Sequence, residues 1–141
     1  MVIQRWQSLL LLIAVVLMCI FCATPYAQIS AADATAEPTG IFVYEAPVFL
    51  IINIVIAIVL FLAIFMYKNL KRQMTVTLIS IVLICASMAT CGFILYSTMP
   101  DAELIWTGGV LLLVIALVCA LAAYRFMGKD RKLLRSYDRL R

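Results

Sequence analysis

The sequence predicts an all-α protein, a transmembrane four-helix bundle, and three observations lead to this fold class. The chain of 141 residues is 67% hydrophobic and only 13% charged, with a mean hydropathy of +1.15. Four stretches of about 20 residues lack Asp, Glu, Lys and Arg, which is the length that crosses a bilayer. The basic residues lie before the first stretch, between the second and third, and after the fourth, which are the ends that face the same side of a membrane. The length leaves room for a single membrane domain, residues 1–141.

Each uncharged stretch is long enough to cross a membrane as a helix. At a rise of about 1.5 Å per residue, about 20 helical residues match the roughly 30 Å hydrocarbon core. A helix also satisfies its own backbone hydrogen bonds in lipid. Pro47 favours a helix start, and Pro100 with Asp101 favours a turn before the last helix. The expected spans are about 8–27, 47–67, 76–96 and 104–124.

The distribution of charge predicts the orientation of the spans. All eleven Lys and Arg residues fall before the first span, in the loop 68–75 or in the tail 125–141. In the other two loops, 28–46 and 97–103, every charged residue is acidic. By the positive-inside rule both termini are cytoplasmic, and the two acidic loops lie on the outer side.

The N-terminal segment has a second interpretation, a cleaved signal peptide. Arg5 would be its basic region, 8–22 its apolar region, and small residues in 23–27 its cleavage site. That interpretation leaves three spans. A retained span is preferred because the apolar run reaches membrane-spanning length and Pro25-Tyr26-Ala27 is a poor cleavage site.

The outer loop 28–46 is expected to cap the bundle. It becomes apolar after Pro38-Thr39-Gly40, where β-branched and aromatic residues follow. Pro and Gly favour a turn there, so the second half either lies in the membrane interface or pairs as a short strand.

The interior of the spans contains polar and small residues but no Asp, Glu, Lys or Arg. Charge-coupled transport normally needs such residues within the membrane. Asn53, Ser80 and Ser87 are expected to hydrogen-bond to a facing helix or to their own backbone. Ala116 and Ala120, and the Gly108-Gly109 pair, permit close helix contacts, which we expect inside the bundle rather than with a partner.

The sequence predicts no enzyme activity, cofactor or metal site. It has no histidine, the commonest acid-base residue and metal ligand at neutral pH. Cys19 and Cys22 form a C-x-x-C motif, so a membrane thiol-redox protein stays an alternative, as does a small transporter subunit. Thiol exchange with substrate proteins normally uses a second cysteine pair in an outer loop, and neither outer loop has a cysteine.

The tail 125–141 contains the predicted site. Its segment 128–141 predicts a short amphipathic helix, with leucine and tyrosine on one stripe and arginines on another. Like charges four residues apart repel, so a series of arginines favours an anionic ligand. Membrane lipids are the first candidate and a protein partner the second, whereas no nucleic acid is expected because no nucleic-acid-binding module is present. The predicted contact residues are Arg131, Leu134, Arg135, Tyr137, Arg139 and Arg141.

Three segments carry a resemblance to a known family. They are 1–7, Tyr67-Lys68-Asn69 followed by Gln73, and the tail 128–141 with its ending Ser-x-Asp-Arg-Leu-Arg. Over essentially its whole length the chain resembles a bacterial family of small four-span inner-membrane proteins, domain of unknown function 4293. The resemblance implies the four-helix topology and a bacterial cytoplasmic membrane, and it implies no activity, cofactor or catalytic residue. Where the family usually reads Lys-Asp-Glu, this chain reads Lys129-Asp130-Arg131, so a basic residue stands in place of an acidic one and the resemblance implies no charge pairing there.

Together these features predict a class of function but no specific activity. We expect a non-enzymatic, multi-pass accessory or scaffold protein of the bacterial inner membrane. Its basic cytoplasmic tail is expected to contact anionic lipid and a protein partner.

Overall fold

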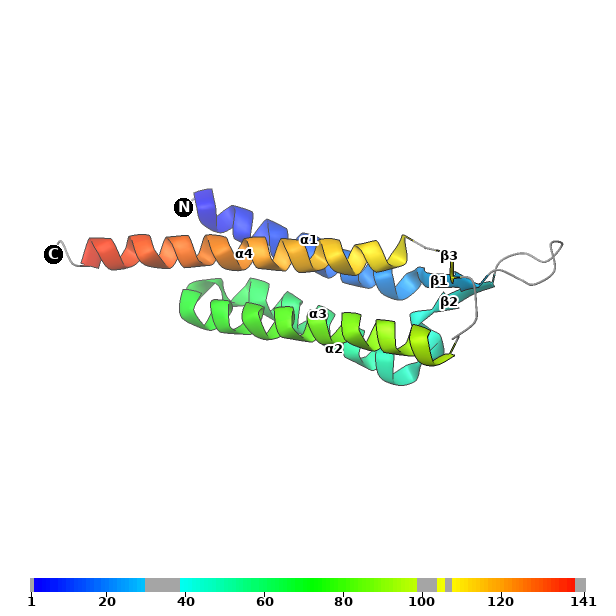
Figure 1. Ribbon diagram of the computed structural model, residues 1–141. Helices are drawn as coiled ribbons and strands as arrows, with labels where there is room; N and C mark the ends of the chain where they lie inside the picture. Colours follow the sequence, from blue (N-terminus) through cyan, green and yellow to red (C-terminus); the bar gives the residue numbers. More distant parts are fainter. Residues whose placement is uncertain (1, 30–38, 99–103, 106–107, 139–141) are drawn as a thin grey trace.

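In the computed structural model the chain forms a bundle of long helices that is capped at one end by a small sheet (Figure 1). The structure describes residues 2–29, 39–98, 104–105 and 108–138. Two short 3-10 helices, η1 (Val43–Glu45) and η2 (Met66–Lys68), flank the second long helix. The other elements are α1 (Val2–Ala23), β1 (Pro25–Ile29), β2 (Thr39–Phe42), α2 (Pro47–Phe65), α3 (Leu70–Thr98), β3 (Leu104–Ile105) and α4 (Gly109–Asp138).

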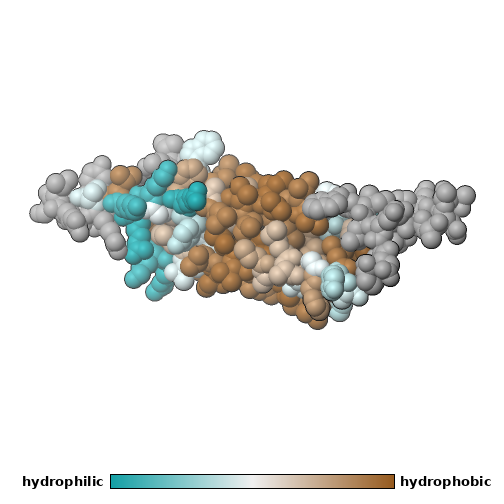
Figure 2. Space-filling view, viewed as in Figure 1, coloured by the Kyte–Doolittle hydropathy of each residue, from teal (hydrophilic) through white to brown (hydrophobic). Residues whose placement is uncertain are grey.

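Within the described ranges four helices are long and apolar enough to cross a membrane. The chain is therefore a multi-pass membrane protein, and the predicted transmembrane four-helix fold is confirmed. Figure 2 shows a broad apolar band around the middle of the bundle and a hydrophilic belt at one end. The start of α1, the end of α4 and the α2–α3 connection lie at this end, which we call the basic end (Figure 1). The opposite end, which carries the three strands, is called the sheet end.

Each helix turns one narrow face inward. α1 and α3 each contact α2 and α4, so α1 and α3 lie on one diagonal of a four-helix arrangement, and the α1–α4 contact is the most extensive. Buried positions alternate three and four residues apart, which is the heptad spacing of helices that pack as a left-handed bundle. They are Gln7, Leu11, Ala14, Met18 and Phe21 on α1, Phe49, Asn53, Ile56, Leu60 and Ala63 on α2, and Leu113, Ala116, Ala120, Ala123 and Met127 on α4.

A three-stranded antiparallel sheet covers the sheet end, with the strand order β2-β1-β3. Gln28 at its centre is paired with Gly40 on one side and with Ile105 on the other. The strand alternative for the second half of loop 28–46 is therefore confirmed. Part of that loop, residues 30–38, lies outside the described residues.

Two predicted spans differ from the helices at the sheet end. The span 8–27 included residues 25–27, but α1 ends at Ala23 and Pro25 begins β1. The reason is that proline disfavours helical backbone at the residue before it, Thr24. Thr24 makes the last bond to α1, because its backbone N–H and its hydroxyl both donate to the Ile20 carbonyl at 3.0 Å. The span 104–124 likewise began too early, because 104–105 pair with β1 as β3.

Aromatic side chains fix the sheet to the helices. Tyr26 of β1 is 2% exposed, and its ring centroid lies 6.5 Å from that of Phe21 and 5.6 Å from that of Phe49. The Phe21 and Phe49 rings meet edge to face at 6.0 Å, a favoured aromatic geometry. Burial, and to a smaller extent Cys91 and Glu45, raise the pKa of the Tyr26 hydroxyl.

The start of α4 packs against the backbone of β1. A Cβ atom at Gly109 would lie 2.5 Å from the Pro25 carbonyl oxygen and 2.8 Å from the Tyr26 Cα, whereas at Gly108 it would meet nothing within 4 Å. Of these two positions, therefore, only position 109 requires glycine. The close contacts predicted for Ala116 and Ala120 are also confirmed as internal, since both are fully buried within this one chain.

A buried hydrogen bond joins α2 to α3. The Ser87 hydroxyl donates to Asn53 Oδ1 at 2.9 Å, and Asn53 Nδ2 donates to the Phe49 carbonyl at 2.8 Å. Ser80 donates to its own helix, to the Val76 carbonyl at 3.0 Å. The expectation that these polar groups bond to a facing helix or to their own backbone is confirmed.

Replacing Ser87 with alanine is expected to lower the free energy of unfolding by about 1 kcal/mol, because Asn53 Oδ1 would lose its donor in a dry interior. The measurement is denaturation of the purified protein in mild detergent. Thr90→Ala is the matched control, since the Thr90 hydroxyl donates to the Ala86 carbonyl of its own helix. Equal effects of the two substitutions would contradict this prediction.

Candidate functional site

The predicted tail site lies on an unbroken continuation of α4. This helix runs through 30 residues from Gly109 to Asp138, so the segment 128–138 is helical as predicted and is continuous with the last span. No described glycine has a positive φ, so Gly128 does not interrupt the helix. Figure 1 shows the end of α4 projecting past the ends of the other helices.

The structure describes the side chains of two of the six predicted contact residues. Arg131 is partly buried, and Leu134 is 58% exposed beside Leu133, which is 51% exposed. The two leucines therefore form an exposed apolar pair on the projecting helix. Arg135 and Tyr137 belong to α4 with side chains outside the described part, and Arg139 and Arg141 lie outside the described residues.

Hydrophilic side chains gather where the apolar band ends, on the face shown in Figure 2. Exposed basic residues of α3, α4 and the α2–α3 connection lie at this end. We call this set the basic belt. The Lys129 ammonium lies 5.7 Å from the centre of the Phe126 ring, a cation–π contact that keeps its charge at the surface. Amines and guanidinium groups at this level are suited to bind anionic headgroups. The exposed members of the belt are Lys68, Lys71, Arg72, Arg125, Lys129 and Lys132.

A group of polar side chains, here called the polar cluster, lies at the basic end and joins three helices; three of its members are buried and Asp130 is half-buried. Gln7 Nε2 of α1 donates to the Asp130 carboxylate of α4. The Thr77 hydroxyl of α3 lies 3.9 Å from Met127 Sδ, one turn before Asp130. Because α3 and α4 run in opposite directions, Gln73, one turn before Thr77, lies level with Asp130. These four residues, Gln7, Asp130, Thr77 and Gln73, are the polar cluster.

The polar cluster was not predicted from the sequence. Its signal was weak, because Gln7 and Gln73 simply flank uncharged stretches and Asp130 stands among basic residues. The structure shows a partner for Asp130, because the side-chain amide of Gln7 on α1 donates to its carboxylate. The tail is thereby anchored to the first helix.

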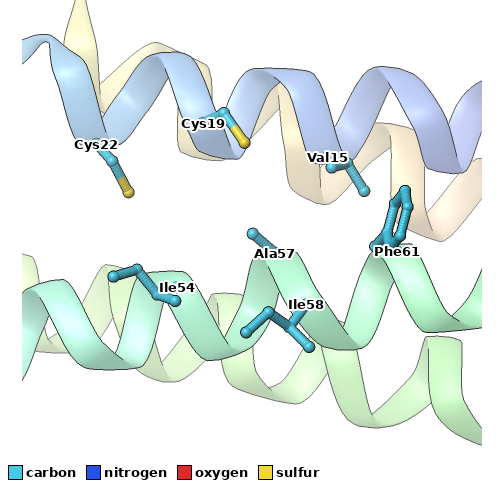
Figure 3. A pocket seen from close by; sticks show the side chains of 7 residues that line it. All are labelled: Val15, Cys19, Cys22, Ile54, Ala57, Ile58 and Phe61. Carbon is cyan, nitrogen blue, oxygen red and sulfur yellow. The ribbon is translucent and has the colours of Figure 1, made fainter.

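Cys19 and Cys22 of the C-x-x-C motif lie together on a groove between α1 and α2. Figure 3 shows both side chains directed from α1 toward residues of α2. Both thiols are free, and no charged or hydroxyl side chain lines the groove to activate them. Among the described residues no group of three His, Cys, Asp or Glu side chains could hold a metal ion. The groove has a volume of about 420 Å³ and is lined by Val15, Cys19, Cys22, Ile54, Ala57, Ile58 and Phe61.

The fold and these features define a four-helix, multi-pass membrane protein with a basic belt and a projecting C-terminal helix. The chain belongs to the family described as Domain of unknown function (DUF4293), whose sequence profile matches residues 3–140. The resemblance stated from the sequence is therefore confirmed. Searches of the curated proteins and of the solved structures gave no significant match. The family description names no activity, so a proposal for function depends on the residues described above.

Proposed function

We propose that this protein is a non-enzymatic accessory or scaffold protein of the bacterial inner membrane, whose basic C-terminal helix contacts anionic lipid and a protein partner. One observation carries the proposal. α4 leaves the apolar band without a break and presents two exposed leucines beyond the basic belt. The rest of the bundle does not cover this apolar pair.

The proposed orientation places the basic end in the cytoplasm, with both termini there. Its support is the asymmetry of charge. The described Lys and Arg residues belong to the basic end, whereas every charged residue in the loops 28–46 and 97–103 is acidic. Short loops with excess Lys and Arg remain on the cytoplasmic side during membrane insertion.

The length of α4 divides its end into two parts. About 20 residues from Gly109 cross a hydrocarbon core of roughly 30 Å and reach Gly128. The headgroup layer adds about 5 to 7 Å on each side, which is about four more helical residues. Lys129, Arg131 and Lys132 therefore lie among headgroups, where each basic residue can add about 1 kcal/mol of attraction to anionic lipid.

The two leucines and the remainder of α4, up to Asp138, lie at or beyond the headgroup layer. Exposed apolar side chains on a helix are typically recognised by an apolar groove on another protein. The arginines that follow would meet acidic groups at the rim of such a groove. The basic belt is therefore assigned to lipid, and the distal part of α4 is assigned to a protein.

The test is a double substitution, Leu133→Gln with Leu134→Gln, in the full-length protein. Burying a leucine in a partner's groove contributes about 1.5 to 3 kcal/mol, so losing two should reduce recovery of the partner at least about tenfold. The measurement is quantitative mass spectrometry of proteins purified with the chain after cross-linking in cells. This variant keeps Asp130 and its bond to Gln7, so the bundle itself is left intact.

The matched control is Lys129→Gln with Lys132→Gln, which removes two charges of the basic belt and leaves the leucines in place. The control should retain the partner, because its effect falls on the lipid contact. If the same proteins are recovered with the leucine variant as with the unaltered chain, the proposed docking role is wrong.

A further inference from the structure

The polar cluster contains two buried hydrogen-bond acceptors that no described residue satisfies. They are Gln7 Oε1 and Gln73 Oε1, on side chains that are 0% and 1% exposed. Leaving a buried acceptor unpaired costs the desolvation energy of that group, so buried polar groups in proteins are almost always paired. Two unpaired acceptors at one level of the bundle therefore indicate a missing hydrogen-bond donor.

We propose that the polar cluster binds water inside the basic end of the bundle. One water molecule has two hydrogens to donate, which matches the two amide oxygens, and an internal water typically has two to four polar partners. The Asp130 carboxylate accepts one hydrogen bond, from Gln7, and has further lone pairs that can accept from water. The Thr77 hydroxyl donates to the Gln73 backbone carbonyl at 2.9 Å, and its oxygen can also accept from water. The cluster lies beneath the basic belt, which gives water a short route from the aqueous side.

The charges around the cluster favour water over a metal cation. Lys71 and Arg72 immediately precede Gln73, and Lys129 and Arg131 flank Asp130. A metal ion bound among these positive charges would be repelled, whereas a neutral donor would not. The site is thus hydrated without being a cation site.

Asn53 provides an internal comparison within the same bundle. Its side chain is also 0% exposed, but its amide donates to Phe49 and its oxygen accepts from Ser87. Both the nitrogen and the oxygen of the Asn53 amide thus have a hydrogen-bond partner within the protein. The proposal predicts that the side chains of Gln7 and Gln73 contact water and that the side chain of Asn53 does not. This prediction is independent of the docking role of α4.

The test is solid-state NMR of the full-length protein in lipid bilayers, in which magnetisation is transferred from water protons to side-chain amides. We expect transfer to the amides of Gln7 and Gln73 to be several-fold faster than transfer to the amide of Asn53. Transfer to Gln73 as slow as transfer to Asn53 would overturn the proposal.

A variant and a change of salt complete the test. Gln73→Met keeps a similar volume and removes one acceptor, so transfer to Gln7 should slow several-fold while transfer to Asn53 stays the same. Unchanged transfer to Gln7 would mean that the two glutamines do not share water. Replacing choline chloride by sodium or potassium chloride at constant ionic strength should leave the thermal unfolding midpoint unchanged, and a rise specific to either metal would overturn the assignment to water.

Discussion

Replacing Gly109 with alanine is expected to lower the free energy of unfolding by about 2 kcal/mol or more, through overpacking at the sheet end. The added methyl group would lie 2.5 Å from the Pro25 carbonyl oxygen, a separation that real Cβ atoms essentially never show. The atoms that must yield belong to the backbone of β1, which is held by β2 and β3 on either side. Chemical denaturation in mild detergent measures the loss.

Gly108→Ala is the matched control for this substitution. It introduces the same methyl group one residue earlier, where no atom lies within 4 Å. The free energy of unfolding should then change little, because neither glycine has a positive φ that alanine would avoid. A loss at position 108 as large as that at position 109 would show that the close approach to β1 is not the cause.

Replacing Ala120 with leucine is expected to cost about 1 to 3 kcal/mol of stability. Ala120 is fully buried on α4, the helix whose contact with α1 is the most extensive in the bundle. Small residues let helix backbones approach closely, and in lipid that packing supplies much of the cohesion between helices. The larger side chain would force α4 away from its neighbours and should lower the thermal unfolding midpoint.

Ala89→Leu is the control for Ala120→Leu, because Ala89 lies on α3 with its side chain exposed to the lipid side. Alanine and leucine have similar helix propensities, so the two substitutions differ mainly in what surrounds them. If both variants unfold at the same midpoint as the unaltered protein, the buried face of α4 accommodates a larger side chain at position 120 and the prediction is wrong.

The number of helices and their approximate positions were predictable from the sequence because both depend on one-dimensional properties. Uncharged length and the placement of Lys and Arg mark where a chain can cross a bilayer. The ends of the helices at the sheet end were less predictable. Residues 25–27 and 104–105 carry no charge, and hydropathy alone cannot separate an apolar strand beside the membrane from the last turn of a span.

The inward face of a helix could be predicted only where a polar group or a repeat of small residues, such as Ala116 and Ala120, marked it. In lipid both faces of a helix are apolar, so the hydropathy of a leucine or an alanine does not reveal which side it occupies. Asn53 and Ser87 were expected to bond inside the bundle, and they do. Gly108 and Gly109 were equivalent in sequence, and only the position of β1 distinguishes them.

The candidate site was predictable in part. The amphipathic pattern of the tail identified the helix that projects from the basic end, because that pattern is local. The bond from Gln7 to Asp130 spans 123 positions of the chain, and it depends on which helices are neighbours in space. Local patterns carry no information of that kind, so the polar cluster emerged only from the arrangement of the helices.

The continuity of α4 has a mechanical consequence. Thirty residues of helix form a rod of about 45 Å, which is enough to pass through a bilayer and extend beyond it. The rod is held near both ends, at Gly109 against β1 and at Asp130 by Gln7. The helix has no break between these two attachments. A tilt of its free end would therefore also move its other end, at Gly109, against the strands of the sheet end.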